Sequence, residues 1–95
     1  MSDCSPLSFT GMTPGVVTCC VKLANQNGAG VPDPPPPSGS LAVPTSFGTF
    51  AFTWSFDGAS ETATIQCTDK PLLMPCFILD GAITHAVQKC GGRPA

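Results

Sequence analysis

Residues 47–67 read FGTFAFTWSFDGASETATIQC. Aromatic side chains occupy every second position from Phe50 to Phe56, and small or hydroxylated residues stand between them. This alternation is typical of a β-strand with one apolar face and one polar face. The Asp57-Gly58 pair favours a two-residue turn, which would place Phe52 opposite Ala63. The stretch therefore predicts a β-hairpin whose aromatic face packs into the core.

A second strand is predicted over residues 16–23, because Val-Val-Thr-Cys-Cys-Val-Lys-Leu is rich in β-branched side chains. On a strand, the adjacent Cys19 and Cys20 would point to opposite faces. Proline and glycine interrupt both residues 1–15 and residues 91–95, so both ends of the chain are predicted to be loops.

Residues 31–40 contain five of the eleven prolines of the chain and predict an extended polyproline strap. A rigid connection laid over the surface is the favoured interpretation of such a run. The alternative is a segment that binds an aromatic groove. The interface candidates are accordingly Trp54 and the run Pro34, Pro35, Pro36 and Pro37.

Residues 82–90 are ambiguous between two structures. Leu79-Asp-Gly-Ala82 repeats the turn signal of the hairpin, which favours a second hairpin and hence a strand. The alternative is a short helix that ends at Gly91, with Ile83, Val87 and Cys90 on one face. The strand is the preferred interpretation, and the helix remains open.

The whole chain, residues 1–95, is predicted to be a single small β domain. The predicted fold class is mainly β, a small antiparallel sandwich or barrel-like domain with long Pro/Gly-rich loops. In the helical alternative for residues 82–90, it also contains one short C-terminal helix. A domain of this length buries only about 60–65% of its unfolded surface. Stability therefore calls for a contribution beyond the apolar core.

The sparse charge excludes some classes of function. Only 11% of the residues are charged, and the net charge is −2. The four basic residues are scattered, whereas nucleic-acid binding needs a clustered basic face, so no nucleic-acid partner is expected. No apolar stretch approaches the ~20 residues of a membrane-spanning helix, so no membrane partner is expected.

Six cysteines predict a disulfide framework if the protein reaches an oxidising compartment. Fifteen pairings are possible, and the spacing does not choose among them. The spacing also lacks the close ligand pairs of a zinc site. The disulfide candidates are Cys4, Cys19, Cys20, Cys67, Cys76 and Cys90.

Catalysis is not expected from these residues. In the second hairpin Cys76 would face His85, but no orienting group or oxyanion-hole motif accompanies the pair. Asp57 and Asp80 are explained as turn residues. The sequence therefore predicts a protein without enzymatic activity, cofactor or metal.

The size, the Met1 start, the strand-and-loop composition and the cysteine usage resemble those of small tailed-phage virion proteins. The resemblance implies a structural accessory protein, such as a head-decoration, neck or tail component. Its partners would be protein subunits of a larger assembly, including copies of itself. It would be made in the host cytoplasm and reside in the virion. The alternative is a secreted, disulfide-rich module that binds or inhibits a target.

Overall fold

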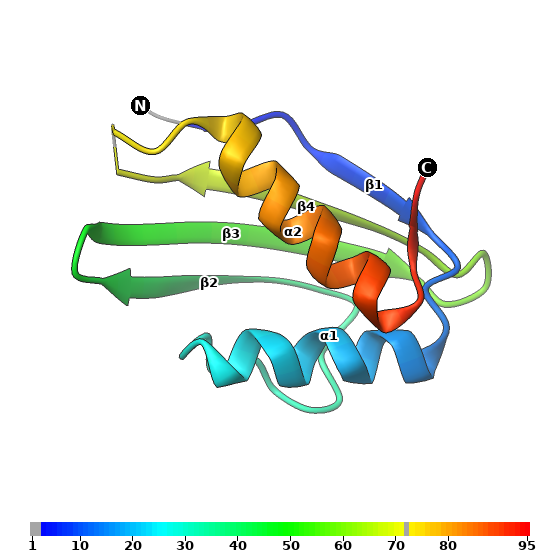
Figure 1. Cartoon of the computed structure of the whole chain (residues 1–95). Coiled ribbons are helices and arrows are strands. Elements are labelled where there is room, and N and C mark those ends of the chain that lie inside the picture. Colours follow the sequence, from blue (N-terminus) through cyan, green and yellow to red (C-terminus); the bar gives the residue numbers. More distant parts are fainter. Residues whose placement is uncertain (1–2, 72) are drawn as a thin grey trace.

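The computed structural model describes residues 3–71 and 73–95. It contains one open antiparallel sheet, with two helices over one of its faces (Figure 1). The strands lie in the order β2-β3-β4-β1-β5. Along the chain the elements are β1 (Leu7–Thr10), α1 (Pro14–Gln26), β2 (Ser38–Thr45), β3 (Gly48–Asp57), β4 (Thr62–Asp69), α2 (Cys76–Cys90) and β5 (Arg93–Pro94).

The prediction of a mainly β chain with an antiparallel sheet is confirmed. The predicted sandwich or barrel is not found, because the sheet does not close and its second layer is helical. Two stretches that had been predicted as strands supply that layer. The helices cover the aromatic face, so this face is directed inward as predicted.

The predicted hairpin is present as β3 and β4, but its turn is longer than two residues. Phe52 pairs with Cys67 and not with Ala63, which is a shift of four residues along β4. From Phe52 to Asp57 the shift is even, so these side chains keep their predicted faces, and an irregularity between Ala51 and Phe52 changes the register beyond them. The even shift places the small side chain of Ala63 between Phe56 on β3 and Phe9 on β1. This packing requirement outweighs the turn preference of Asp57-Gly58.

The strand predicted over residues 16–23 is wrong, because this segment belongs to α1. The Thr13 side chain caps the helix by accepting a hydrogen bond from the Val16 N–H at 3.3 Å, and Pro14 stands in the first turn, where its missing N–H costs nothing. The capping signal thus prevails over β-branched propensity. On the helix Cys19 and Cys20 are about 100° apart and not on opposite faces.

The strand preferred for residues 82–90 is also wrong, and the helical alternative is correct and longer than expected, as α2. The Asp80-Gly81 pair lies inside this helix and forms no turn. The helix ends at Gly91, whose φ of 108° is the left-handed conformation that glycine adopts at little cost.

Both chain ends were predicted as loops, and both contribute strands. Within residues 1–15, positions 1 and 2 lie outside the described residues, whereas β1 occupies an inner position of the sheet. In the C-terminal segment 91–95, β5 pairs with β1 through Phe9–Pro94 and Thr10–Arg93. The pairing becomes possible because Gly92 lets the chain turn closely against Val87, where a Cβ atom would approach within 2.6 Å.

Two disulfides hold α2 at its two ends. Cys4, ahead of β1, is bonded to Cys76, the first residue of α2, and Cys19 of α1 is bonded to Cys90, the last residue. The buried core is small and joins Phe9, Met12, Ala63 and Val87, near the C-terminal end of α2. The predicted disulfide framework is therefore confirmed for four of the six cysteines.

Candidate apolar binding groove

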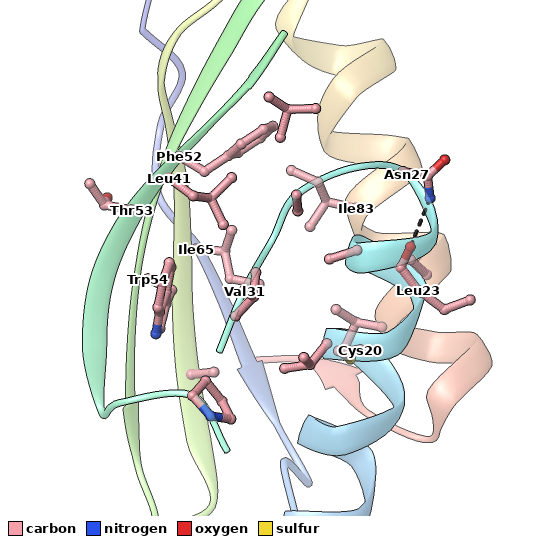
Figure 2. Close-up of a pocket in the computed structure, with 18 of the residues that line it drawn as sticks. Cys20, Leu23, Asn27, Val31, Leu41, Phe52, Thr53, Trp54, Ile65 and Ile83 are labelled. Atoms are coloured by element: carbon pink, nitrogen blue, oxygen red, sulfur yellow. Dashed lines mark hydrogen bonds between the residues drawn. The ribbon is translucent and has the colours of Figure 1, made fainter. Parts of the chain in front are cut away.

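An apolar groove of about 570 Å³ lies between the sheet and the two helices (Figure 2). The sheet side of the groove comes from the aromatic face. Leu41 of β2 stands opposite Phe52 of β3 and Val43 stands opposite Phe50, while Trp54 lies opposite Gly39. The ring of Phe52 is stacked on that of Phe50, with 6.4 Å between their centroids.

The helix side of the groove consists of shorter side chains. On α1, Val17, Cys20, Val21 and Ala24 follow the helical spacing that places residues on one face. On α2 the groove is lined by residues that include Ile83. Sequence reasoning missed this wall because it treated both segments as strands. The spacing 17, 20, 21 and 24, together with the cap at Thr13, is the signal that would have found α1.

Residues 31–37 of the predicted strap border the groove and are tied to both of its sides, whereas residues 38–40 belong to β2. Asn25 of α1 holds Val31 through two hydrogen bonds, of 2.7 and 3.0 Å. The Trp54 Nε1–H donates to the carbonyl oxygen of Pro36 at 3.0 Å, and Pro35 lines the groove. A Cβ atom at Gly39 would come within 2.5 Å of the Trp54 ring, so glycine is needed for this close approach. Of the interface candidates, Trp54 and Pro36 therefore meet within one chain.

The interior of the groove offers almost nothing polar to a ligand. None of the described residues that line it carries a charge. The Asn27 side-chain amide donates to the carbonyl oxygen of Leu23 at 2.8 Å, and the Trp54 N–H is also occupied. The Thr53 side chain points away from the helices (Figure 2). The groove therefore suits an apolar occupant that leaves any polar group at the open mouth.

Cys20 and Cys67 are the two free cysteines among the described residues. Cys20 is half-buried in the α1 wall of the groove, and burial raises the pKa of its thiol. Cys67 is buried on β4, and desolvation likewise raises the pKa of its thiol. Neither environment favours the thiolate that nucleophilic chemistry requires.

The predicted facing of Cys76 and His85 does not occur. Both residues lie on α2, Cys76 is consumed in a disulfide, and His85 is exposed. The described part of the chain holds no group of three or more His, Cys, Asp or Glu side chains placed to bind a metal ion.

A second apolar feature lies at one end of the molecule, where the β2–β3 turn meets the segment before α2. Phe47 and Leu73 are 80% and 98% exposed and border a shallow pocket with Pro71 and Met74. Phe77, in the first turn of α2, is 75% exposed. We call these five residues the apolar end.

Comparisons with models of known families, with curated proteins and with solved structures find no match to this chain. None of the helices in residues 3–71 and 73–95 has the length and apolar character needed to span a bilayer. The groove and the apolar end are thus the features on which a function can be argued.

Proposed function

We propose that the protein binds an apolar small molecule, or the acyl chain of an amphiphile, in the groove between the sheet and the helices. The observation that supports this proposal is an apolar space of about 570 Å³ with no charged residue among the described residues that line it. Small-molecule sites have volumes of about 300–1,000 Å³ and mostly apolar walls. A secreted, disulfide-rich binding module is the alternative function that the sequence predicts. The present proposal specifies the class of ligand that such a module would bind in an oxidising compartment.

Trp54 is the only tryptophan of the chain and stands in the sheet wall, so its emission reports directly on occupancy. Titration with the uncharged probe N-phenyl-1-naphthylamine is expected to raise probe fluorescence and to change the Trp54 emission together. The Ala24→Phe variant places a ring into the groove from α1. It is expected to weaken probe binding at least about tenfold, a loss of about 1.4 kcal/mol.

The matched control is Ala59→Phe, since Ala59 is exposed in the β3–β4 turn and lies outside the groove. This variant should bind the probe as the wild type does. Equal weakening by both substitutions, or probe binding that leaves the Trp54 emission unchanged, would place the probe elsewhere and contradict the proposal.

A second candidate function is a subunit of a larger assembly, such as the virion of a tailed phage, and the apolar end favours it. Exposed large apolar residues gathered at one place are typical of protein contacts. Four cysteines are bonded within the chain, Cys67 is buried and Cys20 lies half-buried in the groove wall, so noncovalent contacts would hold such an assembly together.

This second function predicts that particles purified from the natural source contain the chain, as mass spectrometry would detect. The Phe77→Asp variant should be incorporated at least about tenfold less, because a charge would be buried at the contact. Gln88→Asp, at an exposed site near the other end of α2, is the control. Particles without the chain, or equal incorporation of both variants, would exclude the assembly role.

A further inference from the structure

The two edges of the sheet differ in how they are protected against pairing. β5 is only two residues long and contains Pro94, which is a common form of protection. β2 is eight residues long and pairs with β3 along its whole length, from Ser38–Ser55 to Thr45–Gly48. None of its residues is charged. It is therefore the edge that is open to another strand.

One hydrogen bond identifies which backbone groups of β2 face outward. The Phe56 N–H donates to the carbonyl oxygen of Pro37 at 2.8 Å, in register with the β2–β3 ladder. In an antiparallel pair, hydrogen-bonded and non-hydrogen-bonded positions alternate. The odd-numbered residues of β2 therefore bond to β3, and the even-numbered residues turn their N–H and C=O groups toward solvent. These are Ser38, Ser40, Ala42 and Pro44.

Pro44 is tolerated in β2 because its missing N–H falls at an outward-facing position. It also limits any strand that could be added, since a partner carbonyl opposite Pro44 would find no donor. The usable edge is thus the stretch from Ser38 to Ala42, whose centre is Ser40.

We propose that β2 pairs with β2 of a second copy in an antiparallel manner, with a two-fold axis at Ser40. Ser38 then lies opposite Ala42 of the second copy, Ser40 lies opposite its own equivalent, and each pair exchanges two N–H···O bonds. Pro44 falls outside the paired stretch. The sheet continues across the axis, and the contact is isologous, as two-fold symmetry requires.

The side chains of the edge suit this register. Ser38, Ser40 and Ala42 are small and uncharged, so nothing repels across the axis. On the groove face, Leu41 lies opposite Gly39 of the second copy, where the Trp54 ring occupies the space above the glycine. Leu41 of each copy thus contacts Trp54 of the other, and the two grooves meet at the axis. The pairing needs no ligand and is independent of the proposed function.

The contact is small, because one strand pair buries less than the roughly 1,200 Å² of a stable interface. A reversible dimer that depends on protein concentration is therefore expected. Sedimentation velocity over a concentration series should show the wild type shifting from monomer to dimer.

Ser40→Lys places two ammonium groups opposite each other at the axis and should weaken the dimer at least about tenfold. Ser40→Pro removes an outward N–H without affecting the β3 ladder and should have the same result. The matched control is Thr53→Lys, since Thr53 pairs with Ser40 on the same open face but lies one strand further in.

Retention of the wild-type dimer by Thr53→Lys, with its loss in both Ser40 variants, would establish the edge contact. Three results would overturn it: a wild type that stays monomeric over the whole series, equal weakening by Thr53→Lys, or a dimer that withstands both Ser40 variants. Far-UV circular dichroism, which does not depend on the Trp54 contact across the axis, checks that each variant is folded.

Discussion

Replacing Cys19 and Cys90 together with alanine is expected to lower the free energy of unfolding by about 4 kcal/mol. The two cysteines are 71 residues apart, so their bond restricts most of the unfolded chain. Domains have only about 5–15 kcal/mol of stability, and the core of this one is small. Urea denaturation monitored by Trp54 emission would measure the loss.

The control for this double variant is Cys20→Ala, which removes the neighbouring free thiol from a half-buried position. It should cost about 1 kcal/mol or less. A loss from Cys20→Ala as large as that from the double variant would indicate packing around α1, and not the covalent link, as the source of stability.

The disulfides also explain why the groove is open. α2 is bonded at its first and last residues, to Cys4 and Cys19, and Val87 is its one buried residue among those described. A helix that is held covalently at both ends does not have to fill the space beneath it in order to stay in place. Phe52, Trp54 and Phe56 of the aromatic face can therefore remain half-buried, although Phe50 is buried, and the binding proposal uses this property.

The sequence carries enough information for the sheet and too little for the helices. Alternation from Phe50 to Phe56 repeats over several residues, and only a strand can place those rings on one face. The register was four residues off, because a turn preference is weaker than the need for Ala63 beside Phe9. The turn preference thus predicts the strand register less well than side-chain packing does. That packing cannot be read directly from the sequence.

The strand prediction for the α1 segment rests on its β-branched residues alone and leaves out the helix cap that Thr13 offers. Such propensities differ by less than about 1 kcal/mol per residue, whereas a cap contributes about 1 kcal/mol by itself. The groove could not be foreseen from a strand assignment, since half of its wall is helical. The disulfide pairing likewise depends on the path of both helices.

Phe9 and Phe52 offer a test that separates the core from the groove with the same substitution. Phe9 is 1% exposed and belongs to the buried cluster, so Phe9→Ala should lower the free energy of unfolding by about 3–5 kcal/mol. Phe52 is half-buried in the groove wall, and Phe52→Ala should lower it by only about 1 kcal/mol. Urea denaturation of the two variants measures both values.

Probe binding should follow the opposite order. Phe52→Ala removes a ring from the groove and is expected to weaken N-phenyl-1-naphthylamine binding about tenfold, whereas the folded fraction of Phe9→Ala should bind as the wild type does. If Phe52→Ala instead costs as much stability as Phe9→Ala and leaves probe binding intact, the aromatic face is ordinary core. Only a binding groove predicts that Phe9→Ala mainly lowers stability while Phe52→Ala mainly weakens probe binding. A core residue contributes to stability, whereas a groove residue contributes to ligand binding.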